Sequence, residues 1–311
     1  MSNHHPFFVP ANGQGRREFF TTISKAIGSV MLLPMVSNSV QAYSFPPSQS
    51  WTVGQIMDMF IKEVPGGTID KTVDTLKSGS RDIVVTGIIT TMFATLEVIQ
   101  QAIQAKANFI IAHEPTFYNH LDETDWLAQD EVYTFKADLL KKHNIAIWRN
   151  HDYVHTFVPD GVKTGVANQL GWQKQYDIKS SIISLLAPMS LKAIISQVKD
   201  KLHISQVRYI GDLSKPCRKI LLNPGATMGK GPIQAMMREK PDVLLCGEIH
   251  EWEVAEYVRD ARTKGGNLSL IIMGHSVSEE PGSEFMAGWL REKLPGMKIT
   301  HIPSNNPLSF M

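Results

Sequence analysis

Histidine and carboxylate side chains gather after four apolar segments of this chain, and these residue types together suit metal chemistry. The first segment, Asn108–Ala112, runs directly into His113 and Glu114, and Pro115 then stops any strand ladder. The later clusters are His151 with Asp152 and His155, Glu248 with His250, and His275 with Glu279. A mixed set of imidazoles and carboxylates suits Zn, Mn or Fe better than Ca.

The number of these side chains exceeds what a single tetrahedral ion requires. We therefore expect a site for two divalent metal ions about 3.5–4 Å apart, bridged by a carboxylate or a hydroxide. His275 and Glu279 are spaced so that a helix starting at Ser276 or Ser278 would let them share one face. One histidine at a strand end is more often structural, so this expectation depends on the clusters meeting in one place.

Strands must bring the clusters together, and apolar or β-branched runs predict them directly before each cluster. The expected strands are Ile83–Ile89, Asn108–Ala112, Ile145–Trp148, Lys219–Leu222, Val243–Cys246 and Leu268–Met273. Helical spacing predicts helices over residues 52–64, 95–107, 132–142 and 161–170. The first two strands flank a helix, which favours a parallel pair with a right-handed crossover. In open α/β sheets, ligands bind outside the carboxyl ends of the strands, where these clusters lie.

This order of elements predicts an α/β fold with mixed, largely parallel sheets flanked by helices. We expect residues 52–171 and 223–303 to form a metal-binding α/β core. Residues 172–222 hold few histidines or carboxylates in clusters and predict a small α+β insert domain, for packing, substrate gating or assembly. Residues 304–311 would form a short tail.

Composition and charge narrow the classes of function. The chain has 311 residues, of which 43% are hydrophobic and 20% charged, as in an ordinary globular protein. A formal net charge of +1, with no basic run, gives no indication of a nucleic-acid partner. Cys217 and Cys246 lie far apart and are expected to be core thiols. The chain has no Gly-x-Ser-x-Gly nucleophile elbow and no Gly-x-Gly-x-x-Gly dinucleotide motif after its first strand.

The N-terminal residues predict export. Arg16 and Arg17, followed by an aromatic pair and a mildly apolar stretch, resemble the twin-arginine signal, which a receptor recognises as an address. We expect residues 1–42 to be this signal, with cleavage after Ala42, residues 43–51 to be a linker, and the mature protein to be periplasmic or exported. Lys25 and Pro34 interrupt the apolar stretch, so no membrane span of about 20 apolar residues is expected.

The ordered motifs resemble those of the Nif-three-like family of dinuclear-metal-centre proteins, often labelled GTP cyclohydrolase type 2 homologues. The similarity covers residues 52–303. It rests on the Thr86-Gly87-Ile88 strand, Ile111-Ala112-His113-x-Pro115, the segment Asn150–His155, the strand end Gly247–His250 and Gly274-His275-x-x-x-Glu279. The resemblance implies a pair of divalent metal ions and a toroidal homohexamer whose metal sites face an interior cavity.

The resemblance also implies a ligand set by position. Those ligands are His113, Glu114, His155, His275 and Glu279. Two of them depart from the family pattern, because Glu114 stands where a histidine is usual and His155 where an aspartate is usual. The two exchanges leave three imidazoles and two carboxylates. Asp152 is an alternative ligand after the second strand, and His151 is a candidate for a ligand or for a residue that orients one.

Two hypotheses about function follow from this site. The first is a dinuclear metal-dependent hydrolase of a small-molecule substrate, with a metal-bridged water as nucleophile and Glu248 or His250 transferring protons. An exported protein would meet little GTP, so the family label does not fix the substrate. The alternative is a non-catalytic metal-binding or scaffold protein, whose metal ions would have no open coordination position.

Overall fold

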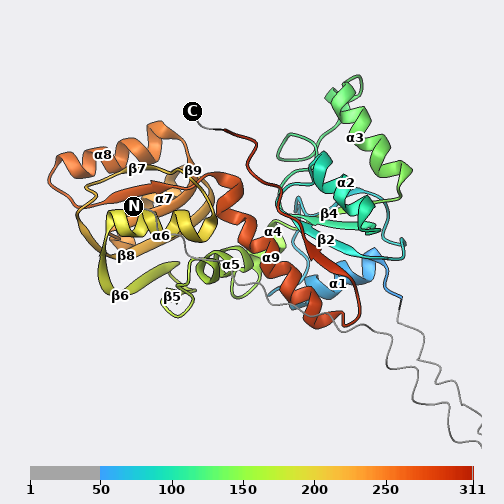
Figure 1. Ribbon diagram of the computed structural model, residues 1–311, viewed down its shortest axis with the longest axis horizontal. Helices are drawn as coiled ribbons and strands as arrows, with labels where there is room; N and C mark the ends of the chain where they lie inside the picture. Colours follow the sequence, from blue (N-terminus) through green and yellow to red (C-terminus); the bar gives the residue numbers. More distant parts are fainter. Residues whose placement is uncertain (1–49, 310) are drawn as a thin grey trace, which may run out of the picture. The chain divides into compact units, whose positions relative to one another are not determined.

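Two mixed sheets flanked by helices form the part of the chain that the computed structural model describes, residues 50–309 and 311 (Figure 1). The predicted α/β class is therefore confirmed. The predicted export signal and most of the predicted linker lie outside these residues. No helix among them combines the length and the apolar character that a membrane span needs.

The first sheet has the strand order β1-β4-β3-β2-β11. Strands β4, β3, β2 and β11 run parallel, and β1 pairs antiparallel with β4. The strands are β1 (Leu76–Ser78), β2 (Ile88–Thr91), β3 (Phe109–Ala112), β4 (Ala146–Arg149) and β11 (Ile299–His301). Every residue of β2, β3 and β4 is buried, which explains why these strands appear in the sequence as continuous rather than alternating apolar runs.

The second sheet has the strand order β5-β6-β8-β9-β10-β7. Strands β8, β9 and β10 run parallel, whereas β5, β6 and β7 are antiparallel to their neighbours. The strands are β5 (Tyr176–Asp177), β6 (Ile182–Ser190), β7 (Arg208–Ile210), β8 (Pro216–Thr227), β9 (Val243–Ile249) and β10 (Ser269–Ile272). The predicted insert, residues 172–222, thus does not form a sheet of its own, because β8 continues past residue 222 and pairs with β9, and β7 pairs with β10.

Side-chain caps begin several of the helices. Thr52 and Gln55 form a capping box, and Thr95, Asp130, Asp160 and Ser190 each accept a hydrogen bond from a backbone N–H of the first turn that follows. The α-helices are α1 (Val53–Glu63), α2 (Leu96–Gln104), α3 (Glu131–Lys142), α4 (Asp152–Thr156), α5 (Gly161–Gln169), α6 (Leu191–Leu202), α7 (Lys230–Glu239), α8 (Glu256–Thr263) and α9 (His275–Lys293). A 3-10 turn, η1 (Asp125–Leu127), and a π-helical turn, η2 (Glu251–Ala255), complete the set.

The first predicted strand is wrong at its start, because β2 begins at Ile88 and not at Ile83. The backbone before β2 is engaged elsewhere: Val53 N–H donates to Ile83 O, and Val85 N–H donates to Trp51 O. The first part of the apolar run therefore bonds to the segment at the start of α1, and only the part from Ile88 onward joins the sheet.

An aromatic cluster anchors the helix that carries His275 and Glu279. The Phe60 ring of α1 stacks on Phe157 at 5.4 Å and meets Trp289 of α9 edge-on at 5.0 Å. Trp148 of β4 lies 6.0 Å from the same Phe60 ring. Helix α9 also contacts β2 and β11 of the first sheet and β8 and β9 of the second. It therefore ties the strand ends of both sheets together.

Candidate metal centre

Strand ends and one helix start bring the predicted clusters together. His113 and Glu114 follow β3, and His151 follows β4, its parallel neighbour in the first sheet. His155 lies in α4, directly after that strand end. Glu248 lies in β9, whereas His275 and Glu279 lie in the first turns of α9, directly after β10. Side chains from strand ends of both sheets therefore meet in one place.

Glu279 lies at the centre of the cluster. Its Oε2 is 3.0 Å from His275 Nε2 and 3.3 Å from His113 Nε2, and its Oε1 is 3.9 Å from His155 Nε2. His275 Nε2 is also 3.1 Å from Glu114 Oε1. Donor atoms of His113, Glu114 and Glu279 all lie within 4.8 Å of one another, and so do those of His113, His151 and His155. These two overlapping groups share His113.

A glycine lets the backbone approach Glu279 closely. Gly225 has φ +70°, and a Cβ at this position would lie 2.1 Å from Glu279 Oε1. Ser278 holds the same place together, because its Oγ accepts from Gly225 N–H and donates to His275 O. Strand β8 passes this point through a register shift between Asn223 and Ala226, although the Asn-Pro-Gly sequence indicates a turn. The glycine is a site residue that the sequence analysis missed.

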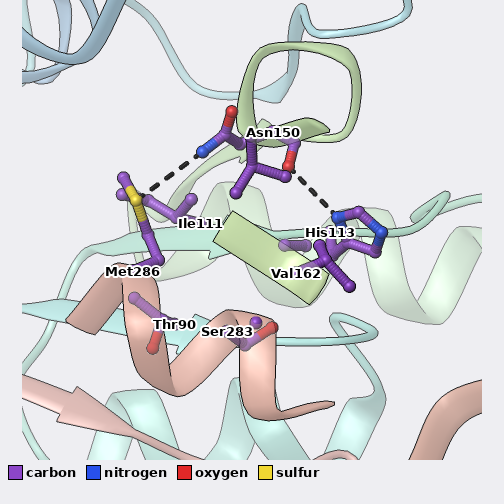
Figure 2. A pocket seen from close by; sticks show the side chains of 10 residues that line it. Thr90, Ile111, His113, Asn150, Val162, Ser283 and Met286 are labelled. Atoms are coloured by element: carbon purple, nitrogen blue, oxygen red, sulfur yellow. Dashed lines mark hydrogen bonds between the residues drawn. The ribbon is translucent and has the colours of Figure 1, made fainter. Parts of the chain in front are cut away.

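Each of the four imidazoles uses its Nδ1 atom for an oxygen partner. The pairs are His113 with Asn150 O at 3.3 Å, His151 with Asp152 at 3.0 Å, His155 with Asp160 at 3.2 Å and His275 with Glu248 at 2.9 Å. Figure 2 shows the first of these contacts. Metal-binding histidines typically donate the second ring nitrogen to a carboxylate or carbonyl, which fixes the tautomer. The arrangement therefore leaves the Nε2 atoms for a cation.

Burial and hydrogen bonding show that these residues fit a divalent metal. His113, Glu114 and Glu279 are all buried, and His113 Nε2 makes no hydrogen bond although Glu279 Oε2 is 3.3 Å away. An unpaired buried polar atom is costly and calls for a partner. Two buried carboxylates among imidazoles form a donor set that could hold a divalent metal ion.

The charges of the cluster shift its pKa values strongly. Burial lowers the pKa of His275, but hydrogen bonds with Glu114 and Glu279 outweigh this and raise the pKa to about 11. Burial raises the pKa of Glu279, but the charge of His113 and the hydrogen bond with His275 hold it well below its usual range. Burial together with the His113 charge lowers the pKa of His151 to about 4. Without a metal, a proton on His275 balances the carboxylates.

The remaining predicted residues take different places. Glu248 reaches the cluster through His275 Nδ1, and 42% of its side chain is exposed. His250 instead lies 3.4 Å from Glu253 and stacks on the Trp252 ring at 4.4 Å. Asp152 accepts from Thr72 Oγ1 and Val73 N–H as well as contacting His151. The Asp152 carboxylate therefore links the loop before β1 to the segment that follows β4.

Three charged residues near the cluster, of which Asp74 and Arg149 are buried, were not among those predicted from the sequence. Asp74 accepts hydrogen bonds from His151 N–H and Tyr153 N–H, which fix the turn into α4. Asp160 holds His155 and also caps α5, and its position before Gly161 is a sequence signal for a cap. Arg149, at the end of β4, is completely buried beside Glu114. Nothing in the sequence pattern distinguishes it from an exposed arginine.

A large cavity lies beside the cluster at Glu248 and His275, whereas the side chains around His113 are tightly packed. The cavity measures about 1020 Å³ and is lined by Phe93, Arg208, Glu248 and His275, among others. Behind His113, between β3, Asn150 and Met286 of α9, only about 10 Å³ is free (Figure 2). A small molecule therefore has room on the side of Glu248 and His275.

Solved structures with a similar fold come from several bacteria. A Staphylococcus aureus hypothetical protein superposes with a TM-score of 0.69 at 20% identity, over 85% of this chain and 100% of that chain. A Bacillus cereus protein related to NIF3 gives a TM-score of 0.65 at 19% identity, over 85% and 99% of the two chains. These likenesses show that the fold is shared.

Sequence comparisons identify the family. The chain is 25% identical over 235 residues to a "GTP cyclohydrolase 1 type 2 homolog" of Clostridium acetobutylicum, covering 72% of this chain and 83% of that protein. A protein of the same name from Clostridium perfringens is 24% identical over 216 residues, covering 66% and 78%. The family model Duf34/NIF3 (NGG1p interacting factor 3) matches residues 72–307. The chain therefore belongs to the Duf34/NIF3 family.

Proposed function

We propose that this protein is a hydrolase of a small molecule that uses two divalent metal ions, Zn, Mn or Fe. The proposed ligands are His113, Glu114, His155, His275 and Glu279. The observation that carries the proposal is the shared orientation of the imidazoles, each with Nδ1 held by an oxygen and three with Nε2 near Glu279. The adjacent cavity favours an enzyme over a scaffold with a closed metal site.

The protein's own groups prepare the site for hydrolysis. A pair of divalent cations, when bound, supplies an activated water and polarises the oxygen of the substrate. Glu248 holds His275 Nδ1 and reaches the cavity with a partly exposed carboxylate, so it can accept a proton at the cavity wall. Around Asn150 and Met286, behind His113, only about 10 Å³ is free, which leaves no room for bulk water there.

The substrate is proposed only as a class. The names of the two Clostridium relatives suggest hydrolysis of a nucleotide ring, so GTP belongs in any panel of substrates. Phosphoesters, amides and cyclic amides complete the panel, since each has an oxygen that a metal pair can polarise and a bond that water can cleave.

Glu279→Gln tests the proposal, with Glu292→Gln as the matched control on the exposed surface of α9. We expect Glu279→Gln to lower turnover on the order of 100-fold or more under defined Mn or Zn, because a central carboxylate is lost. The control should match the wild type. Equal turnover by wild type and Glu279→Gln, with each substrate that reacts, would remove the hydrolase proposal.

We also propose the homohexamer that the family resemblance implies. Light scattering of the metal-loaded protein should give a mass of six chains. A monomeric mass at micromolar concentration would contradict it.

A further inference from the structure

A row of buried charges of alternating sign runs behind Glu114, away from the proposed metal ions. Arg149 Nη2 lies 3.1 Å from Glu114 Oε2, and Arg149 Nη1 lies 3.8 Å from Asp122 Oδ2. Lys77 Nζ lies 3.2 Å from the same Asp122 oxygen. The side chains of Arg149, Asp122 and Lys77 are 0%, 3% and 6% exposed. Two cations and two anions thus balance one another inside the protein.

The backbone fixes the guanidinium in this row. Arg149 is the last residue of β4 and lies opposite Ala112, the last residue of β3. Its Nε donates to His113 O at 3.4 Å, and its Nη1 donates to His120 O. Three sides of the planar group are therefore engaged, which leaves Arg149 little freedom to turn away from Glu114.

The loop after β3 delivers Asp122 to the guanidinium. Asp122 has φ 58°, and its Oδ1 accepts from Phe117 N–H at 2.7 Å. Asn119 braces the same loop, because its amide group bonds to the backbone of Phe117, Leu121 and Glu123. This bracing directs Oδ2, the second carboxylate oxygen, toward Arg149 and Lys77.

The two carboxylate oxygens of Glu114 contact different groups. Oε2 faces Arg149, whereas Oε1 lies 3.1 Å from His275 Nε2 and so faces the cluster. Only one oxygen is then free for a cation. A neutral residue at position 114 would leave two cations and one anion in the row, and an uncompensated buried charge is strongly unfavourable.

We infer that Arg149 is a positioning residue, held by Asp122 and Lys77, that fixes Glu114 as a metal ligand through Oε1 alone and makes a carboxylate necessary at position 114. This inference rests on the proposed metal site. It assigns a role to a buried ion-pair row that the hydrolytic chemistry itself does not use.

Metal binding by Arg149→Gln tests the inference, with the exposed Arg238→Gln as the matched control. We expect Arg149→Gln to weaken Co²⁺ and Zn²⁺ binding about 10- to 100-fold in a chelator competition. The Co²⁺ absorption spectrum should also shift, because Glu114 can rotate. Arg149→Lys keeps the positive charge but loses the paired N–H donors of the guanidinium, so it should recover part of the metal affinity. Arg238→Gln should match the wild type in both readouts.

Two further variants keep the test independent of folding yield. Asp122→Asn lies outside the cluster and should weaken binding in the same direction by a smaller factor. Glu114→Gln with Arg149→Gln restores charge balance, so its midpoint of thermal unfolding without metal should exceed that expected from adding the two single effects.

The possible failures are distinguishable. A wild type that binds metal and hydrolyses substrate, with Arg149→Gln and Asp122→Asn unchanged in affinity and spectrum, would overturn this inference alone. A wild type that binds none of Zn²⁺, Mn²⁺, Fe²⁺ and Co²⁺ would overturn the proposed function and this inference with it.

Discussion

At the scale of single residues, the position of Glu279 decides the geometry of the candidate site. Three imidazole Nε2 atoms lie within 3.9 Å of its two oxygens. Its own place depends on the missing side chain of Gly225, which lets β8 pass against the carboxylate. A carboxylate held by a close backbone has little room to adjust, so small changes in its surroundings should reach the metal ions directly.

Gly225→Ala should therefore abolish tight metal binding, because the new Cβ would lie 2.1 Å from Glu279 Oε1. Gly229→Ala is the matched control, since Gly229 has a similar φ of +75° but no atom within 4 Å of the place its Cβ would take. An alanine at either position is strained by the positive φ, but only Gly225→Ala also brings a Cβ against Glu279. Titration with Zn²⁺ measures the difference, and equal affinities in the two variants would contradict this account of Gly225.

Metal affinity should rise with pH. The pKa of His275 is about 11 in the metal-free protein, so a cation that takes Nε2 must displace a proton at neutral pH. Glu279 is already ionised there, because its pKa lies well below the usual range, and it releases no proton. We expect at least about a tenfold gain in apparent affinity per pH unit between about pH 6.5 and 8.5, because His275 releases one proton. His113, whose pKa burial lowers but the Glu279 charge raises by more, releases a second proton where it is protonated. Chelator competition measures it, and a flat profile would contradict the assignment of His275 as a ligand.

At the scale of elements, α9 carries two of the proposed ligands and depends on tight packing against α5. A Cβ at Gly282 would lie 2.8 Å from Val162 Cα, and a Cβ at Gly165 would lie 2.3 Å from Pro281 O. The two helices therefore approach one another more closely than side chains at these positions would allow. Helix α9 cannot shift without moving His275 and Glu279.

Gly282→Ala should destabilise the protein by about 1–3 kcal/mol, as overpacking typically does, and should also weaken metal binding. Gly288→Ala lies in the same helix with open space around it and should stabilise the protein by about 0.5–1 kcal/mol, since alanine favours helix. Thermal and urea unfolding of both variants separates the two effects. A stable Gly282→Ala with unchanged metal affinity would show that this helix contact does not position the ligands.

The strands before the polar clusters were predictable from the sequence, whereas the segments and side chains that they contact were not. The apolar runs at residues 109–112 and 243–246 are buried in β3 and β9, as their composition indicated. An apolar run does not reveal what covers it, so the switch of partners before Ile88 was missed. Asn223-Pro224-Gly225 is a turn-forming sequence, yet it lies within β8 as an irregularity, and β8 pairs with β9 on both sides of it. The loop after β3 brings Asp122 to the buried Arg149 side chain. Hydrophobic periodicity in the sequence does not reveal such a long-range contact.

At the scale of the whole molecule, two sheets contribute to one site, and the family shares this fold. The proposed ligands lie directly after β3, in α4 and at the start of α9, so they follow strands of both sheets. The proposed export route adds a constraint, because a twin-arginine signal would carry a folded protein with metal already bound. The residues of that signal lie outside the described structure.

Replacing Arg16 and Arg17 by lysine should trap the protein in the cytoplasm, since the paired arginines are the proposed address. Cell fractionation followed by immunodetection measures this, with Arg81→Lys, far from the signal in sequence, as the control. Export of the double variant at the wild-type level would refute the twin-arginine proposal without affecting the metal site.

The central claim is a pair of metal ions held by residues that follow strands of both sheets, and anomalous diffraction from crystals grown with Mn or Zn tests it most directly. The account predicts two anomalous peaks about 3.5–4 Å apart, with Glu279 between them and Glu114 and His155 each in contact with an ion. One peak, or two peaks that touch neither Glu114 nor His155, would contradict it.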